Sequence, residues 1–140
     1  VGVCLRGDVR ARAVSARGVR AVGPAFVVSG LLGGGASTIA AVRAQAPWPT
    51  SVIVEAETEA QALEAVQAGA NGVLLDEFTP EQLTQLVPRL RDCSTRGVVL
   101  EASGIQPEQL QAYAATGIDL ISTSAPVTRS RWLDLSMRFT

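Results

Sequence analysis

The chain has 140 residues, of which 47% are hydrophobic and 18% charged, and its 12 basic and 13 acidic residues give a formal net charge of -1. This length fits one domain, and the composition excludes a disordered chain and a small disulfide-built scaffold. A near-neutral charge also disfavours nucleic-acid binding, which depends on a strong positive field. No run approaches the roughly 20 apolar residues that span a bilayer, and the N-terminus does not resemble a signal peptide. We therefore expect a cytoplasmic protein without a membrane span.

All 12 basic residues are arginines, so the chain contains neither lysine nor histidine. Any mechanism that needs an imidazole base, a Schiff-base lysine or a histidine-bound metal is excluded unless another chain supplies the group. Cys4 and Cys93 lie far apart in the sequence and lack the spacing of a metal or redox pair. We expect a structural role for both cysteines.

The first elements differ from the rest of the chain. Small or apolar residues alternate with charged ones over Val9–Val14 and again over Gly18–Val22, which is typical of a half-exposed antiparallel hairpin. Ala25–Val28 is an apolar run that predicts a strand. The hairpin pattern of the first residues is therefore followed by Ala25–Val28 as the first of the expected core strands.

A glycine-rich loop follows over residues 30–35. It lacks the lysine of a Walker motif and does not match GxGxxG, so we interpret it as a connection. The next helix is expected to be capped by Ser37 or Thr38 and to turn Ile39 and Val42 inward.

From Ser51 onward, apolar runs alternate with segments of helical period, which is typical of repeated βα units. Val52–Val54 predicts a buried strand. Thr58 and Gln61 form a capping box that opens a helix, and Gly69 ends it. The inward residues of this helix are expected to be Ala62, Leu63 and Val66.

The next unit repeats the plan. Gly72–Leu75 predicts a strand, Thr79 is the N-cap of a helix, Pro80 takes its first position, and Gln82 completes the capping box. The apolar stripe of this helix is formed by Leu83, Leu86, Val87 and Leu90.

Val98–Leu100 starts a third unit, followed by a helix from about Pro107 to Thr116 and a strand over Ile118–Ile121. The final segment, Leu133–Phe139, alternates as the first residues do. The sequence thus predicts an α/β fold with about five parallel strands and antiparallel strands from both termini. Because this is too few for a closed eight-stranded barrel, an incomplete βα barrel or an open parallel sheet is expected.

In parallel βα folds, ligands bind at the carboxyl ends of the strands. Carboxylates there could hold a divalent cation or sugar hydroxyls, although Glu57 and Glu77 also suit plain helix entries. Serine and glycine turns there could hold a phosphate or be ordinary turns. The residues at these ends are Glu55, Glu57, Asp76, Glu77, Glu101, Ser103, Gly104, Ser122, Thr123 and Ser124.

The stretch from Thr50 to Phe139 resembles the carboxy-terminal part of quinolinate phosphoribosyltransferase, the carboxylating nicotinate-nucleotide pyrophosphorylase. The run VIVEAETEAQALEAVQAGANGVLLDEFTPEQL is similar to the family's segment in which a Glu-rich strand precedes a Leu-Asp-Asn-Phe turn. VVLEASGI resembles its Leu-Glu-Ala-Ser-Gly-Gly-Ile turn, and TGIDLISTSAPVTRSRWLDLSMRF resembles its closing segment. Several motifs in the same order make this resemblance specific.

The resemblance implies one domain over residues 1–140 with the family's incomplete α/β barrel. It also implies a reaction in NAD biosynthesis that joins quinolinate to phosphoribosyl pyrophosphate with Mg²⁺. Glu55 and Asp76 match the family's carboxylates for ribose hydroxyls and metal. Ser103 and Gly104 match its phosphate turn, and Ser124 matches a glycine of a second phosphate turn.

The departures from the family pattern mainly concern the positively charged side chains that the family uses to bind its substrates. A Lys-Asp-Asn-His run of the family matches Ser29–Leu32 here, its turn asparagine is Glu77, and a histidine of its final turn is Thr128. Most of the family's N-terminal domain has no counterpart, and residues 1–22 are either a remnant hairpin of that domain or a match to the first barrel strands. Two polyanionic substrates need convergent cations, so catalysis by this chain alone is not expected.

Three functions follow from this reading. The first is a scaffold of this family without autonomous catalysis that acts as an assembly, structural or regulatory partner in a homo-oligomer or a larger complex. The second is phosphoribosyltransferase activity within a complex that supplies the missing cations. The third is a module that binds a phosphate ester.

Overall fold

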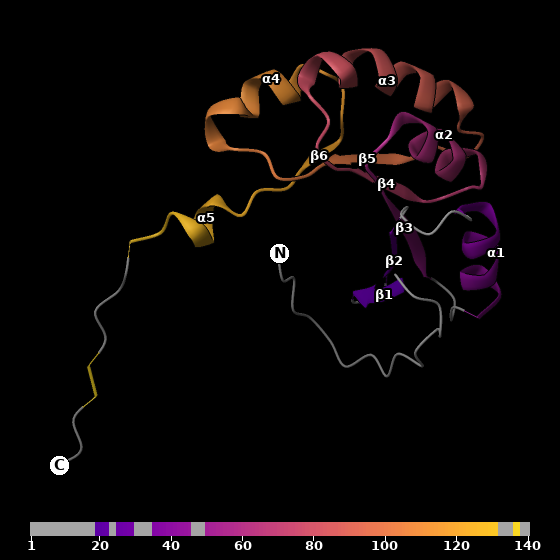
Figure 1. The fold of residues 1–140 in the computed structure, drawn as a ribbon, viewed down its shortest axis with the longest axis horizontal. Helices are drawn as coiled ribbons and strands as arrows, with labels where there is room; N and C mark the ends of the chain where they lie inside the picture. The colour runs from indigo at the N-terminus through magenta and orange to yellow at the C-terminus, as the bar shows by residue number, and fades with distance from the viewer. Residues whose placement is uncertain (1–18, 23–24, 30–34, 46–49, 132–135, 138–140) are drawn as a thin grey trace.

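The computed structural model describes residues 19–22, 25–29, 35–45, 50–131 and 136–137. These residues form one sheet in which the strands lie side by side in chain order (Figure 1). The strands are β1 (Val19–Val22), β2 (Ala25–Ser29), β3 (Ser51–Ala56), β4 (Gly72–Leu75), β5 (Val99–Ala102) and β6 (Leu120–Ile121). The loop at residues 30–34 lies outside the described residues.

The pairing of the strands confirms a parallel α/β sheet. β2 pairs with β3, β3 with β4, β4 with β5, and β5 with β6, all in parallel. Each crossover is one helical connection, which is how parallel neighbours are joined. In the described part of the chain β1 and β6 are the two edges and do not pair with each other, so a barrel is not confirmed.

The antiparallel strands expected from the two termini are not supported. Residues 9–14 lie outside the described residues, and β1 pairs antiparallel with β2 instead, with Val19 opposite Val28. Only two residues separate these strands, which suits an antiparallel hairpin. Of the expected closing strand, the structure describes only Ser136 and Met137, and they are not in a strand.

The helices that connect the parallel strands pack next to one another on one face of the sheet (Figure 1). Successive helices are in contact, α1 with α2, α2 with α3, and α3 with α4. Their bounds are α1 (Gly35–Gln45), α2 (Glu59–Gln67), α3 (Pro80–Cys93), the 3-10 turn η2 (Pro107–Gln109) and α4 (Leu110–Ala114). A further short helix, α5 (Ala125–Thr128), follows the last strand and lies apart from the others (Figure 1).

Alternation along the strands separates a covered face from an open one. The face under the helices is buried and includes Val52, Val54, Ala56, Val73, Leu75, Leu100 and Ala102. We call the opposite face the inner face, and its residues are Ile53, Glu55, Leu74, Val99, Glu101 and Leu120. Val99 and Leu120 on this face are 46% and 51% exposed, so the described part of the chain leaves the inner face uncovered.

Both predicted capping boxes are confirmed. The Thr58 and Thr79 side chains accept from the backbone amides of Gln61 and Gln82, and the side-chain oxygen of each glutamine accepts the N–H of the N-cap residue. These bonds satisfy N–H groups that the first turn of a helix leaves without a partner. The predicted stripe of α3 is also confirmed, since Leu83, Leu86, Val87 and Leu90 are all buried.

One helix prediction is wrong at the start of the series, and one helix after its end was not predicted. α1 begins at Gly35, so Ser37 and Thr38 lie inside its first turn rather than at its cap. Its inward residues, Ile39 and Val42, are buried as expected. The short helix α5 directly after Ser124 was not predicted. None of the described helices is both long and apolar enough to cross a membrane.

Candidate functional site at the carboxyl edge of the sheet

The residues that follow the strands lie together at one edge of the sheet, where backbone hydrogen bonds hold each of them to the end of the preceding strand. This carboxyl edge carries all the site residues expected from the sequence. Because each strand end is bonded to the next, these residues follow one another along the edge in chain order. The bonds run from Asp76 N to Ala56 O (3.0 Å), from Ser103 N to Leu75 O (3.2 Å), and from Ser122 N to Ala102 O (2.8 Å).

The two carboxylates expected to hold ribose hydroxyls or metal stand on neighbouring strands. Glu55 lies on β3 and Asp76 directly follows β4, and both are half-buried. In the described part of the chain no group of three histidine, cysteine, aspartate or glutamate residues gathers. A magnesium ion at this pair would therefore need further oxygen ligands, which Mg²⁺ commonly takes from substrate phosphates and water.

The first expected phosphate turn comprises Ser103 and Gly104. The Ser103 N–H donates to Leu75 O, so it does not point to a ligand. Gly104 has φ of +75°, while a Cβ added there would meet nothing within 4 Å. The glycine is therefore required by the left-handed backbone rather than by a close approach of other atoms.

The second turn lies beside the first, because Ile105 N donates to Ser122 O at 3.3 Å. The Ser122 hydroxyl donates to the Glu101 carboxylate on the inner face. Ser124 is exposed, and its carbonyl accepts from Val127 N and from the amide of the next residue, both at 2.9 Å, in the first turn of α5. The structure thus places the two turns together, but the Glu101–Ser122 pair uses one of their hydroxyls.

Glu57 and Glu77 lie on the outer side of this edge. They line a hollow of about 330 Å³ with Thr58 and Phe78, between the start of α2 and the start of α3. This placement agrees with the simpler interpretation of both glutamates as charges at helix entries. Glu77 is also the one non-glycine residue among those described that has a positive φ, 61°.

Cations are missing from the strand ends. None of the described residues at positions 55–57, 76–77, 103–104 and 122–124 is an arginine. Arg89 and Arg129 are ion-paired with glutamates of α2 and η2, at 2.5 Å and 2.7 Å. Three further arginines lie at the opposite, amino edge of the sheet. Arg43 and Arg91 bind the turns before β4 and β6, and Arg96 lines a cavity there. The edge can therefore offer carboxylates and hydroxyls to a ligand, but no positive charge from these positions.

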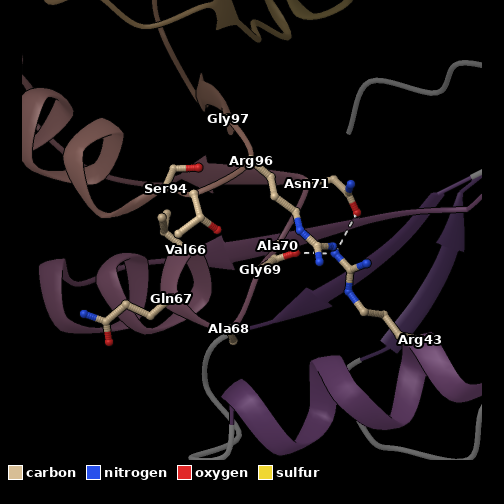
Figure 2. Close-up of a pocket in the computed structure, with 11 residues that line it drawn as sticks. Arg43, Val66, Gln67, Ala68, Gly69, Ala70, Asn71, Ser94, Arg96 and Gly97 are labelled. Atoms are coloured by element: carbon tan, nitrogen blue, oxygen red, sulfur yellow. Dashed lines mark hydrogen bonds between the residues drawn. The ribbon is translucent and has the colours of Figure 1, made fainter.

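Sequence reasoning missed a cavity of about 350 Å³ at the amino edge, between the end of α2 and the loop after α3. Arg43 and Arg96 line it, and Figure 2 shows both guanidinium groups reaching into it. A signal was present in the sequence, since a glycine two residues before an amide or acid side chain occurs at Gly69–Asn71 and at Gly117–Asp119. The sequence alone does not show which arginines bind the glycine carbonyl and the amide or acid side chain of each turn, because those arginines lie 26 to 28 residues earlier.

Comparisons with known proteins bear on the family and the fold of this chain. Residues 29–138 match the family model described as quinolinate phosphoribosyl transferase, C-terminal domain. The chain is 36% identical over 98 residues to a probable carboxylating nicotinate-nucleotide pyrophosphorylase of Synechocystis, which covers 69% of this chain. It is 34% identical over 107 residues to the human carboxylating nicotinate-nucleotide pyrophosphorylase, which covers 76% of this chain.

Solved structures resemble the fold as well. A crystal structure of a NadC deletion mutant matches with a TM-score of 0.69 and 27% identity, over 85% of this chain and 42% of that one. The nicotinate-nucleotide pyrophosphorylase of Francisella tularensis matches with a TM-score of 0.66 and 28% identity, over 79% of this chain and 38% of that one. The chain spans about a third of the length of the curated relatives that it matches. It belongs to the quinolinate phosphoribosyl transferase family, and it matches that family's C-terminal domain.

Proposed function

We propose that this chain is a scaffold of the quinolinate phosphoribosyl transferase family that does not catalyse the reaction alone and acts as an assembly partner. The relatives are carboxylating nicotinate-nucleotide pyrophosphorylases by name, which supports a role of this chain in NAD biosynthesis. The single observation that carries the proposal is the absence of lysine and histidine from the chain together with the lack of arginine at the described strand ends.

Charge is the physical reason. Quinolinate carries two carboxylates and phosphoribosyl pyrophosphate carries several phosphate charges, so bringing them together requires positive groups that offset their repulsion. Glu55, Asp76 and Glu101 at the described strand ends add negative charge instead. A partner that places arginine or lysine at this edge would supply what is missing, and phosphoribosyltransferase activity within such a complex is the alternative that this chemistry leaves open.

Turnover of quinolinate and phosphoribosyl pyrophosphate with Mg²⁺ tests the catalytic part of the proposal. We expect no product from the purified chain above a buffer blank. The Glu55→Gln/Asp76→Asn double variant is the control for contaminating host enzyme, because a contaminant would be unaffected by it. Turnover by the chain that disappears in this variant would contradict the proposal.

The inner face supports the assembly role. Ile53, Leu74, Val99 and Leu120 lie on it, and a shallow cavity of about 150 Å³ opens there between β3 and β6. The two most exposed of these side chains, Val99 and Leu120, are apolar, and burial of such surface is favourable by about 25 cal/mol per Å². A second copy of the chain, or another protein in a larger complex, would therefore gain free energy by covering this face.

A further inference from the structure

A polar arrangement at the amino edge of the sheet occurs twice. In the first copy, Arg43 at the end of α1 donates to the Gly69 carbonyl and, at 3.2 Å, to the Asn71 side-chain oxygen. The same Asn71 oxygen accepts the Val52 amide at 2.9 Å. One side chain of helix α1 is thereby connected to the turn before β4 and to the start of β3.

The second copy has the same plan two strands further along the sheet, with α3, β5 and the turn before β6. Arg91 in α3 donates to the Gly117 carbonyl at 2.7 Å and to Asp119 at 3.0 Å. The other oxygen of Asp119 accepts the Leu100 amide at 2.8 Å. In both copies the arginine precedes the glycine by 26 residues and the acceptor side chain by 28, and the strand amide precedes that acceptor by 19.

The two copies differ in charge. Asp119 is a carboxylate, so Arg91 is in an ion pair. Asn71 is a neutral amide, which accepts the same hydrogen bonds but leaves the charge of Arg43 uncompensated. Among the described residues, no ion pair involves Arg43 or Arg96.

These two arginines meet in the cavity of about 350 Å³ at this edge. Figure 2 shows the Arg96 guanidinium coming from the loop after α3 and lying next to that of Arg43. The described lining residues include the hydroxyl residues Ser94 and Thr95 and the exposed Asn71, but no carboxylate. Two cations held together without a counter-charge repel each other, and an anion between them would remove that cost.

We propose that this cavity binds an oxyanion, the phosphate or carboxylate group of a small molecule, between Arg43 and Arg96. Guanidinium groups are planar forks of N–H donors that match phosphate and carboxylate oxygens. Arg43 is already positioned by its bonds to Gly69 and Asn71, so the site is partly preorganised. It lies at the amino edge of the sheet, apart from the carboxyl edge on which the proposed function rests.

The test is a titration of the 140-residue chain with inorganic phosphate at constant ionic strength, followed by amide NMR. We expect a dissociation constant on the order of 1 mM, as for a small anion at an open site, with shifts at residues 67–71 and 94–97. Malonate as a second titrant distinguishes a carboxylate ligand from a phosphate ligand. Chloride should not shift the amide resonances of residues 67–71 or those of residues 94–97.

Two substitutions should weaken binding about tenfold, because each removes one charge-assisted contact or cancels its charge. Asn71→Asp gives the first copy the carboxylate that Asp119 provides in the second, so Arg43 becomes ion-paired while the Val52 amide keeps its acceptor. Arg96→Gln removes the other cation. Arg89→Gln, which makes the same change in net charge on the exposed face of α3, should leave the affinity unchanged.

Unfolding curves of the variants accompany the titration. Arg96→Gln keeps the test valid if Asn71→Asp fails to fold, since no hydrogen bond or ion pair among the described residues involves the Arg96 side chain. The proposal is overturned if the amides at residues 67–71 and 94–97 do not respond to tens of millimolar of either anion. It is also overturned if folded Arg96→Gln protein binds as the unchanged chain does, or if Arg89→Gln weakens binding equally.

Discussion

Glu77 has a backbone conformation that does not suit its side chain. Its φ of 61° lies in the left-handed region, which costs an L-residue with a Cβ roughly 1–2 kcal/mol and which asparagine and glycine tolerate best. The family that this chain resembles carries asparagine at this position. The left-handed conformation of this turn therefore suits asparagine better than the glutamate that this chain carries.

Replacing Glu77 by asparagine should stabilise the chain. We expect the free energy of unfolding to rise by about 0.5–1 kcal/mol, because the left-handed conformation costs asparagine less than glutamate. Urea unfolding measures the change. Glu57→Asn, at an exposed position directly before the N-cap of α2, is the control and should give no gain, since Glu57 does not have a positive φ. An equal gain in both variants, or a loss at position 77, would contradict the conformational explanation.

Asp119 makes stability depend on pH at the amino edge. Burial raises the pKa of its carboxyl, but the hydrogen bond from Leu100 N and the hydrogen bond and charge of Arg91 outweigh this and lower the pKa. A lowered pKa in the folded chain stabilises it above the usual aspartate pKa of about 3.9, and this contribution is lost as the pH falls further.

The corresponding experiment compares Asp119→Asn with the unchanged chain. Between pH 6 and pH 3 the unchanged chain should lose stability more steeply, because asparagine accepts the Leu100 amide without titrating, as Asn71 does for Val52. Thermal unfolding at intermediate pH values would record both slopes. Parallel slopes would show that Asp119 does not contribute.

At the scale of the elements, α3 shows what its sequence could predict. Its capping box, its first-position proline and its buried stripe are local features with a fixed spacing, so the sequence alone identifies them. α1 could not be placed as well, because both Ser37 and Thr38 have the chemistry of a cap and yet lie inside the helix. The short helix α5 has four residues, too few for a periodic pattern to indicate it.

Thr79→Ala should lower the free energy of unfolding by about 1 kcal/mol, because it removes the side chain that accepts the Gln82 amide at the start of α3. Thr84→Ala is the control in the same helix. Thr84 is exposed and bonds back to the Pro80 carbonyl, and alanine has the higher helix propensity, so stability should stay the same or rise slightly. Chemical denaturation compares the two, and an equal loss in both would show that capping is not the cause.

For the candidate site, the sequence predicted only the order in which its residues follow one another along the carboxyl edge of the sheet. Parallel strands bring their carboxyl ends together, so the sequence was enough to place Glu55 beside the turn that holds Asp76, and Ser103 beside the turn that holds Ser124. The Glu101–Ser122 bond and the engaged Ser103 amide depend on rotamers and strand register, which no residue pattern specifies. The roles of Glu55, Asp76, Ser103, Gly104 and Ser124 in ligand binding stay predictions.

At the scale of the whole molecule, the described part of the chain is a sheet with helices on one face and an uncovered inner face (Figure 1). A sheet that is apolar on both faces normally has both of them covered. Here the inner face mixes apolar side chains with the carboxylates of Glu55 and Glu101. This combination suits a face that is partly buried in an assembly and partly exposed to a polar ligand.

Sedimentation velocity of the chain at micromolar concentration tests this account most directly. We expect species larger than the 14.6 kDa chain and a shift to monomer in the Val99→Thr/Leu120→Gln variant, which makes the inner face more polar. Val127→Thr is the matched control, because Val127 is 79% exposed on α5 outside this face, and it should sediment as the unchanged chain does. A stable, monodisperse monomer of the unchanged chain would contradict the assembly role.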